Sequence, residues 1–338
     1  MRVGVYGAGS IGAYVGGRLA TTGVAVTLVM RAPRAAALAA DGLHVSDLHG
    51  FDVTLPPRAL TVATTAAALA ACDCVLMTVK ARDTLAAAAA LAPIVGKDAT
   101  IVSLQNGVRN AEELATALVP RAVVAGMVGF NVLGRSATHF HQATSGRLVL
   151  AQLPSGAAPP IADALVRAGL ATDVVGDLSP ILWGKLLFNL NNAVNALAGV
   201  PLAEQLGSRG YRRIMAAVIR EGHAVLRRAG IAATFDAPVP TSWIPPLMEL
   251  PTAIFKRLAR KLVDVDPSAR SSMWEDLQRG RPTEVDLLNG EIVTLGRQHA
   301  IETPFNTRLV KLVKSYENQP PPSLSAEVLW QKLTSDAS

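Results

Sequence analysis

The 338-residue sequence predicts an α/β protein, with a parallel sheet in its first half and an all-helical second half. The first half alternates short β-like runs with helical patterns, the order typical of parallel strands joined by crossover helices. From about Leu178 the strand-like runs end and long helical patterns follow. The length favours two domains, and 50% hydrophobic residues with only 4% aromatics favour packed helices over a β-sandwich.

The strands of the first half are short runs rich in apolar residues. The interior runs are apolar throughout, as expected of strands buried on both faces of a sheet. A helix is predicted over Ser10–Thr22, with Gly23 ending it. The last two runs are expected to form an antiparallel hairpin. The predicted strands are Arg2–Tyr6, Val24–Met30, Cys72–Val79, Thr100–Leu104, Val123–Asn131, Ala137–Gln142 and Arg147–Leu153.

The second half consists of six helical patterns. A hinge is predicted over 176–180, because Pro180 suits the first turn of a helix. The predicted domains are therefore 1–178 and 179–318, followed by a tail over 319–338 that starts with a proline-rich piece and is loosely held. The predicted helices are Pro180–Gly199, Ser208–Gly230, Pro245–Leu262, Pro267–Arg279, Thr283–His299 and Asn306–Glu317.

Composition argues against several classes of protein. No run of 18 or more apolar residues occurs, which argues against a membrane span. The net charge of +6 is dispersed and accompanies no nucleic-acid motif, which argues against nucleic-acid binding. The two cysteines, Cys72 and Cys74, are expected to be reduced and buried in a cytoplasmic protein. The sequence does not determine the oligomeric state, and a homodimer is compatible with it.

A glycine-rich segment lies between the first predicted strand and the first predicted helix. In that context it indicates a dinucleotide-binding turn of the Rossmann type. Gly7 permits the tight turn, Gly9 lets the backbone approach a pyrophosphate, and Gly12 allows the helix to pack closely on the strand. The helix N-terminus then offers free N–H groups to the phosphates. The predicted contacts are Gly7, Ala8, Gly9, Ser10, Ile11 and Gly12.

The end of the second strand indicates NADPH as the cofactor. A site for NAD usually places an acid there to accept a hydrogen bond from the ribose 2′-hydroxyl. This chain has Arg31 and Arg34 instead, and an arginine can pair with a 2′-phosphate through charge-assisted hydrogen bonds. Arg31 is the first choice for that contact and Arg34 the second, the alternative being that both are surface charges.

Lys80 and Asn106 each follow a later predicted strand, where open α/β sheets bind their ligands. Lys80 is a candidate for the adenosine side of the cofactor, and Asn106 for the region near the nicotinamide. Each residue alone is equally compatible with ordinary loop chemistry, since Asn106-Gly107 is a common turn sequence.

The helical half carries a polar stripe within an apolar pattern. At ~100° per residue, Lys185, Asn189 and Asn192 share a face of roughly 60° on one helix. A cation and two carboxamides are costly to bury without partners, so the stripe indicates a ligand-facing surface. A buried structural network is the alternative.

Further along, Thr283 and Asp286 resemble a capping box with an acid in place of the usual glutamate. Glu284 would then occupy the first helical turn, where the helix dipole favours a carboxylate. A ligand-binding acid and an ordinary first-turn acid are equally compatible with this position.

Several of these motifs, in this order, resemble the ketopantoate reductase (2-dehydropantoate 2-reductase) family over roughly residues 1–317. The glycine-rich turn, the strand ending in Lys80 and the Asn106 turn all fit the family. The more specific matches are the segments 183–185 with Asn189, 271–273, and 281–286. The resemblance implies a Rossmann domain joined to a helical domain of the 6-phosphogluconate dehydrogenase-like type, with the active site in the cleft between them.

The resemblance also implies a reaction and roles for residues. NADPH would reduce 2-dehydropantoate (ketopantoate) to pantoate, a step of pantothenate and coenzyme A biosynthesis. Lys185 would stabilise the developing oxyanion and supply the proton, and Glu284 would hold the substrate hydroxyl and orient the lysine. Asn189 and Ser272 would bind the substrate, and Asn106 would help to place the nicotinamide. No metal is required, because a fixed cation polarises the carbonyl.

One departure from the family affects the substrate rather than the reaction type. Well-known members carry a second asparagine eight residues after the lysine, where this chain has Ala193, so Asn192 or Asn195 would substitute. The segment 237–266 also matches no motif of the family. Two alternatives remain: a reductase of another small 2-oxo acid, and a non-catalytic NADPH-binding regulator, which is disfavoured because Lys185 and Glu284 are both present. The pair His139 and His141 shares a strand face, but without a third ligand it does not predict a metal site.

Overall fold

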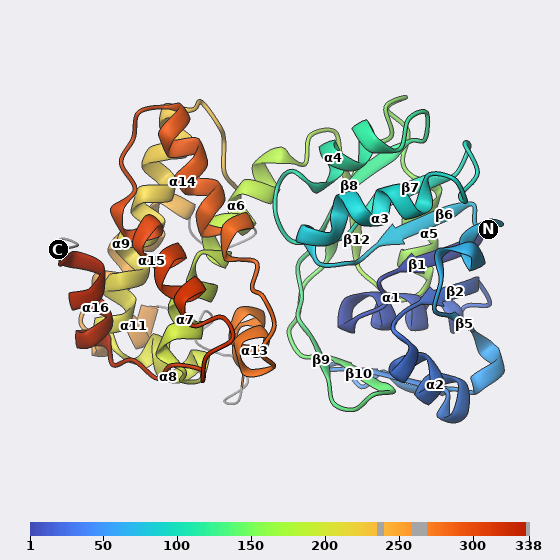
Figure 1. The fold of residues 1–338 in the computed structure, drawn as a ribbon, viewed down its shortest axis with the longest axis horizontal. Helices are drawn as coiled ribbons and strands as arrows, with labels where there is room; N and C mark the ends of the chain where they lie inside the picture. Colours follow the sequence, from blue (N-terminus) through green and yellow to red (C-terminus); the bar gives the residue numbers. More distant parts are fainter. Residues whose placement is uncertain (235–239, 259–268, 336–338) are drawn as a thin grey trace. The chain divides into compact units, whose positions relative to one another are not determined.

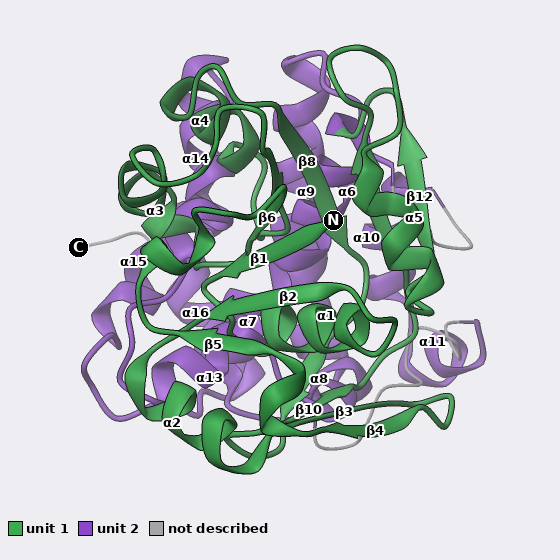
Figure 2. Ribbon diagram, turned by 90° about the vertical axis from the view of Figure 1, so that its right-hand side faces the viewer, with its two compact units in different colours: residues 1–178 green, residues 179–338 purple. Residues whose placement is uncertain are grey.

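A computed structural model describes residues 1–234, 240–258 and 269–335 of the chain. The chain divides into two compact units, Met1–Leu178 (unit 1) and Ser179–Ser338 (unit 2), which are coloured separately in Figure 2. In the described part of the chain, no helix combines the length and the apolar character needed to cross a membrane.

Unit 1 is built on an eight-stranded sheet with strand order β12-β11-β8-β7-β6-β1-β2-β5 (Figure 1). From β1 the chain passes to β2 and β5 on one side and then returns to β6 on the other. The carboxyl ends of β1 and β6 therefore form a topological switch point, where open α/β sheets bind ligands. The strands are β1 (Arg2–Tyr6), β2 (Ala25–Val29), β5 (Thr61–Ala63), β6 (Cys74–Met77), β7 (Thr100–Ser103), β8 (Val123–Val128), β11 (Leu148–Ala151) and β12 (Thr172–Val175).

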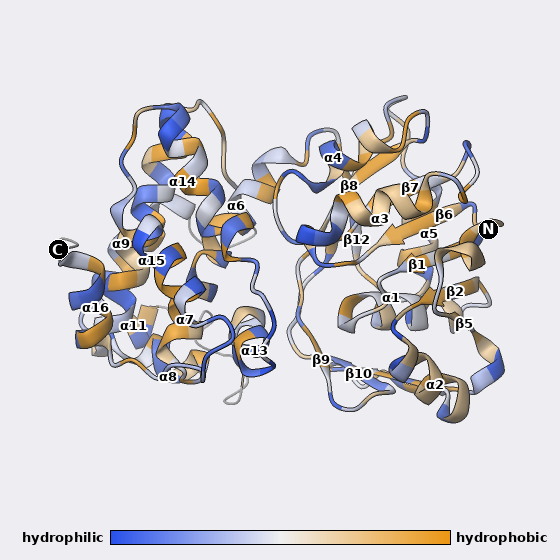
Figure 3. Cartoon of the chain, viewed as in Figure 1, coloured by the Kyte–Doolittle hydropathy of each residue, from blue (hydrophilic) through white to orange (hydrophobic). Residues whose placement is uncertain are grey.

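This sheet is buried on both faces, as its apolar strands predicted. Leu76 of β6 packs into one core, whereas Val75 and Met77 pack into another on the opposite face. The strands β6 and β7 are correspondingly hydrophobic in Figure 3. Cys72 and Cys74 are buried free thiols. The helices and 3₁₀ turns of unit 1 are α1 (Ser10–Ala20), α2 (Ala32–Asp41), η1 (Pro57–Ala59), η2 (Ala66–Leu69), η3 (Ala81–Asp83), α3 (Thr84–Leu91), α4 (Asn110–Ala117) and α5 (Pro160–Arg167).

The hairpin predicted between 137–142 and 147–153 is wrong. The first of these runs lies in a second, four-stranded sheet of order β4-β3-β10-β9, and β11 pairs instead with β8 and β12. Besides its neighbour β9, β10 pairs with β3, more than 90 residues earlier, with His139 opposite His44. The strands of this sheet are β3 (Leu43–Asp47), β4 (Asp52–Leu55), β9 (Val132–Gly134) and β10 (His139–Gln142).

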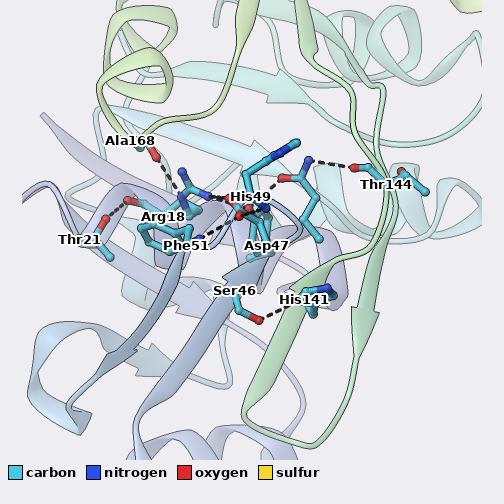
Figure 4. A network of polar contacts seen from close by, with 11 residues as sticks. Arg18, Thr21, Ser46, Asp47, His49, Phe51, His141, Thr144 and Ala168 are labelled. Carbon is cyan, nitrogen blue, oxygen red and sulfur yellow. Dashed lines mark hydrogen bonds and ion pairs between the residues drawn. The ribbon is translucent and has the colours of Figure 1, made fainter. Parts of the chain in front are cut away.

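A buried arginine joins α1 to the second sheet (Figure 4). The Arg18 guanidinium donates to Asp47 Oδ2 at 2.9 Å, to the Ala168 carbonyl at 2.9 Å and to the Tyr14 hydroxyl at 2.8 Å. It also lies 3.7 Å from the centre of the Phe51 ring. Burial acts to raise the pKa of Asp47, but hydrogen bonds from the Phe51 and His49 N–H groups and from Arg18 lower it below its usual value. This network holds α1, the helix that begins at the end of the glycine-rich loop, against the second sheet.

Unit 2 is helical in its described residues, and three of its predicted helices are interrupted. The pattern 180–199 forms two helices that break at Leu190, and the pattern 283–299 begins as a separate 3₁₀ turn. The predicted helix 245–262 breaks near Pro251; its last residues, 259–262, and the start of the next helix, 267–268, lie outside the described residues. The elements are α6 (Ser179–Asn189), α7 (Asn191–Ala198), α8 (Leu202–Gly207), α9 (Arg209–Arg228), η4 (Thr241–Trp243), α10 (Ile244–Glu249), α11 (Thr252–Leu258), α13 (Ser272–Gln278), η5 (Val285–Leu287), α14 (Asn289–Gln298), α15 (Pro304–Ser315) and α16 (Ala326–Thr334).

The predicted loose tail contains α16, which packs against α9 and α15. Its Leu329 and Leu333 side chains are fully buried, and the Tyr211 hydroxyl donates to the Leu324 carbonyl just before the helix at 2.6 Å. The expectation of a loosely held tail was therefore wrong through residue 335, because the apolar face of α16 completes the core of unit 2.

Candidate active site

The glycine-rich loop of unit 1 connects β1 to α1 at the switch point of the sheet. Gly7 has a φ of +85°, and a Cβ there would lie 2.8 Å from the Val79 backbone. A Cβ at Gly12 would lie 2.8 Å from the Val5 side chain. At Gly9, in contrast, a Cβ would have no neighbour nearer than 3.7 Å. Packing thus explains two of the glycines, whereas Gly9 leaves open space at the N-terminus of α1, where first-turn N–H groups lack intrahelical partners.

Lys80 and Asn106 lie on the same edge of the sheet as this loop, because β6 is the neighbour of both β1 and β7. Both side chains are half-buried. The Asn106 carbonyl accepts a hydrogen bond from Asn110 Nδ2 at 2.7 Å, and Gln105 Nε2 donates to Thr84 Oγ1 at 2.7 Å beneath the turn. Thr84 and Asn110 were not predicted, and Gln105 was noted only as part of the Asn106 segment, because nothing in the local sequence indicates which buried polar groups will meet.

The two arginines after β2 differ in their surroundings. Arg31 is exposed and precedes the first turn of α2. Arg34 is half-buried, and its guanidinium lies 5.2 Å from the centre of the Phe140 ring. Arg31 is thus the more accessible of the two to a ligand at the end of β2.

In unit 2, Lys185 is held on a helix that packs against another backbone segment. A Cβ at Gly184 would collide with the backbone of Thr234, whose N–H donates to the Pro180 carbonyl at 2.9 Å. Trp183 is buried on the same helix. A glycine inside a helix costs about 0.5–1 kcal/mol relative to alanine, so the close approach explains why this residue precedes the lysine.

Lys185 and Glu284 interact electrostatically within unit 2. Burial lowers the pKa of Lys185 from 10.5 to about 8, and the negative charge of Glu284 opposes that shift. Lys185 is half-buried in α6, and Glu284 is 6% exposed just before η5. The two residues proposed from the sequence as the catalytic pair therefore lie close enough for the charge of Glu284 to affect the pKa of Lys185.

The segment around Glu284 does not form the predicted capping box. Asp286 pairs with Lys314 of α15 at 2.8 Å. Thr283 donates from its backbone N–H and its hydroxyl to Glu317 Oε1, at 2.8 and 2.7 Å. Glu284 consequently precedes a 3₁₀ turn instead of occupying the first turn of a long helix. The local pattern failed because both capping side chains bond to residues at or just after the end of α15, which is distant in the sequence.

The predicted polar stripe is divided by the break at Leu190. Lys185 and Asn189 lie on α6, whereas Asn192 lies on α7; both asparagines are half-buried. The Leu190 carbonyl accepts a hydrogen bond from Asn289 Nδ2 of α14 at 3.3 Å. Lys185 and Asn189 thus share one helix, and Asn192 follows a one-residue interruption at which Leu190 keeps right-handed helical dihedrals, φ −57° and ψ −27°.

Ser272 is the exposed first residue of α13, which packs against α7. The preceding Ser271 donates its hydroxyl to the Asn192 carbonyl at 3.2 Å, so Asn192 and Ser272 belong to one local arrangement. Asn195 is fully buried; it accepts from the Ser271 N–H at 2.8 Å and donates to Gln205 Oε1 at 2.9 Å. Asn195 thus supports this arrangement from within the core, and Asn192 is the better candidate to replace the asparagine absent at position 193.

The histidines of the second sheet are engaged with protein groups. The Ser46 hydroxyl lies 2.8 Å from His139 Nε2 and 2.8 Å from His141 Nδ1, and the His44 ring stacks on that of His139. Over residues 1–234, 240–258 and 269–335, no group of three or more histidine, cysteine or acidic residues is arranged to hold a metal ion.

Comparisons with known proteins cover both units. The family model described as Ketopantoate reductase PanE/ApbA matches residues 3–155, and that of its C terminal region matches residues 177–317. The chain is 32% identical over 322 residues to the 2-dehydropantoate 2-reductase of Archaeoglobus fulgidus, covering 94% of this chain and 98% of that protein. It is 28% identical over 339 residues to the enzyme of the same name from Mesorhizobium japonicum, covering 93% and 97% of the two chains.

Solved structures give the same result for the fold. A PanE/ApbA family ketopantoate reductase from Ralstonia eutropha JMP134 matches with a TM-score of 0.80 and 31% identity, over 94% of this chain and 99% of that chain. D-mandelate dehydrogenase in complex with NADH and anilino(oxo)acetate shares the fold, with a TM-score of 0.79 at 20% identity over 94% and 99% of the chains.

The switch-point glycine loop, the helical unit and these relatives together define a nicotinamide-dependent oxidoreductase. More particularly, the chain belongs to the ketopantoate reductase family. The regulator alternative is therefore set aside.

Proposed function

We propose that this protein reduces 2-dehydropantoate to pantoate with NADPH, in the biosynthesis of pantothenate and coenzyme A. The observation that carries the proposal is the desolvated Lys185 within the field of Glu284, in the unit that matches the family's C-terminal model. The relatives named 2-dehydropantoate 2-reductase support the choice of substrate. We place the reaction in the cytoplasm, where the two buried thiols remain reduced.

The proposed chemistry needs a proton donor and a stabiliser of negative charge. When bound, NADPH supplies the hydride that the 2-oxo carbon accepts. Lys185, as an ammonium, stabilises the charge that develops on the carbonyl oxygen and then donates a proton to it. A pKa of about 8 keeps this group mostly protonated at neutral pH and still able to release its proton. Water then returns the proton to the lysine.

The remaining candidates would bind and orient the substrate. Glu284 holds the substrate hydroxyl and favours the protonated form of Lys185 through its charge. Asn189 and Asn192 donate hydrogen bonds to the substrate, and the Ser272 hydroxyl is assigned to its carboxylate. The exposure of Ser272 at the start of α13 supports that assignment.

The residues of unit 1 fit a dinucleotide with a 2′-phosphate. The open space at Gly9 admits a pyrophosphate next to the first-turn N–H groups of α1. Exposed Arg31 supplies a cation at the end of β2 for the 2′-phosphate. Lys80 is assigned to the adenosine side and Asn106 to the nicotinamide side of the cofactor.

Steady-state kinetics test the proposal directly. Purified protein is assayed by nicotinamide absorbance with 2-dehydropantoate and either NADPH or NADH, and the product is identified as pantoate. We expect turnover with 2-dehydropantoate and a lower KM for NADPH than for NADH. Absence of turnover on 2-dehydropantoate would remove the proposed substrate.

A second candidate is the reduction of another small 2-oxo acid. It is favoured by Ala193, a fully buried apolar residue where well-known family members carry an asparagine. A panel of 2-oxo acids with apolar side chains, assayed beside 2-dehydropantoate, separates the two. A higher kcat/KM for a panel member would identify that acid as the better substrate.

A further inference from the structure

The segment that carries Glu284 is held by a residue outside the proposed catalytic set. Glu317 follows the C-terminal end of α15, and its Oε1 accepts both the backbone N–H and the hydroxyl of Thr283, the residue before Glu284. Thr283 is 7% exposed, so these are protected hydrogen bonds to a carboxylate acceptor.

The location of Glu317 is unfavourable for α15 itself. The C-terminal end of a helix carries a partial negative charge, so an acid there repels it. The compensating interactions are those with Thr283, which lies 34 positions earlier in the sequence. The carboxylate therefore stabilises the Thr283–Glu284 segment, not the helix that it follows.

Glu284 depends on such support because it lies outside any helix. Its backbone, with φ −98° and ψ 21°, is followed by the 3₁₀ turn η5, in which its carbonyl accepts from the Leu287 N–H at 3.0 Å. One side of Glu284 is thus fixed by η5 and the other by the bond between Thr283 and Glu317.

We propose that Glu317 is a positioning residue of the active site, which holds Glu284 in place near Lys185 through the backbone and hydroxyl of Thr283. This inference rests on the proposed function for its catalytic consequence, but its geometric part does not. If Glu284 shifts, Lys185 loses the charge that favours its protonated form, and its pKa falls below about 8.

Three other titratable groups on the neighbouring elements have partners of their own, and α14, which packs on η5, adds buried Glu291. Glu221 of α9 accepts from the Phe305 and Asn306 N–H groups, and His223 of α9 contacts the Thr241 carbonyl. On η5 and α15, Asp286 pairs with Lys314. We therefore expect a change in the titration of Lys185 to report on Glu284.

The test is the pKa of Lys185 in full-length protein, measured by NMR titration of ¹³C-labelled lysine side chains. The resonance is assigned by its loss in Lys185→Met. We expect Glu317→Ala to lower this pKa by about half a unit or more. Glu317→Gln keeps an oxygen acceptor for Thr283 and should restore the wild-type value. In the kinetic assay, the alkaline limb of kcat should move to lower pH in Glu317→Ala only.

A matched control is Lys314→Gln, which removes the exposed ion pair between Lys314 and Asp286, close to the Thr283–Glu317 contact in the sequence, with side chains 48% and 57% exposed. It should leave the Lys185 titration unchanged. If Glu317→Ala fails to fold, Thr283→Val against Thr283→Ser tests the hydroxyl bond alone, because the backbone N–H of residue 283 still donates to Glu317. A smaller fall in the Lys185 pKa is then expected in Thr283→Val. An unchanged Lys185 pKa in Glu317→Ala or Thr283→Val would overturn the proposal. An equal fall in Glu317→Gln would also overturn it, because the effect would then be one of charge alone.

The titration requires no turnover, so its outcome is independent of the substrate. If wild type and Glu317→Ala have the same Lys185 pKa while the wild type reduces 2-dehydropantoate, the positioning role alone is refuted. If the Lys185 pKa is lower in Glu317→Ala than in wild type while the wild type does not reduce 2-dehydropantoate, the proposed function alone is refuted.

Discussion

Replacing Lys185 by methionine should destroy activity and stabilise the protein at the same time. Methionine has a similar length and carries no charge, so it removes the ammonium while keeping the packing of α6. We expect kcat to fall at least about a hundredfold, the usual scale for losing a general acid. The stability gain follows from the cost of keeping a charged lysine in a partly desolvated position.

The magnitude follows from the pKa of Lys185. The change from 10.5 in the unfolded chain to about 8 in the folded chain corresponds to about 3 kcal/mol, at ~1.4 kcal/mol per pKa unit. Since the folded-state pKa is lowered, the penalty is absent above pH 10.5, grows as the pH falls toward 8 and is complete below that. Lys185→Met should therefore raise the free energy of unfolding by about 3 kcal/mol at pH 7 and by about 1 kcal/mol at pH 10.

Denaturant unfolding followed by tryptophan fluorescence measures this gain. All four tryptophans, at 183, 243, 274 and 330, lie in unit 2, so the signal reports on the unit that contains the lysine. Lys332→Met in α16 is the control; the residue is exposed, and such changes usually stay within about 0.5 kcal/mol. A gain that is absent at pH 7, or undiminished at pH 10, would show that Lys185 is not held as a desolvated ammonium.

Three further substitutions test the supporting structure. Gly184→Ala should destabilise unit 2 by about 1–3 kcal/mol, measured by denaturant unfolding, because the added Cβ collides with the Thr234 backbone. In an exposed helix the same change raises the free energy of unfolding by about 1 kcal/mol, and such a rise here would contradict the contact. Arg18→Met should cost unit 1 about 3–5 kcal/mol by circular dichroism, since it leaves Asp47 buried without its partner. Its control, Arg2→Met, breaks an exposed ion pair and should cost no more than about 1 kcal/mol, and equal losses would argue against the buried network. Arg31→Ala should raise the KM for NADPH and spare that for NADH, whereas equal effects on both cofactors would count against a 2′-phosphate contact.

The parts of the fold that the sequence predicted are those set by local chemistry. The glycine turn after β1 and the apolar strand β6 were predicted correctly. A tight turn requires glycines, and burial on both faces requires a continuous apolar run, so both features can be recognised within a few residues of sequence. In the second sheet, β10 was predicted as a strand but with the wrong partner, and β3, β4 and β9 were missed. The missed strands are only three to five residues long, and β3 and β4 carry several polar residues. The β3–β4 and β9–β10 pairs are local, but the pairing of β3 with β10 that joins them spans more than 90 positions, which no local pattern encodes.

The same distinction applies to the candidate site. Lys185, Asn189 and Glu284 could be named because their types and spacing match a known family. The break at Leu190 could not, since the apolar pattern continues through it, and the group that bonds its carbonyl, Asn289, lies 99 positions away. The capping-box prediction failed for a similar reason, because the Thr283 hydroxyl donates to Glu317 and the Asp286 carboxylate accepts from Lys314.

These observations together explain why the helical unit is built around an unfavourable charge. A lysine fully exposed to water would keep a pKa near 10.5 and would release its proton to an alkoxide less readily. A lysine buried without a counter-charge would lose its proton at neutral pH and could not stabilise an oxyanion. Glu284 brings Lys185 between these limits, and Gly184 and the Thr283–Glu317 contact fix the two elements on which the pair depends. Under the proposed function, the stability that Lys185 costs is the consequence of holding a proton donor whose pKa is close to neutral pH.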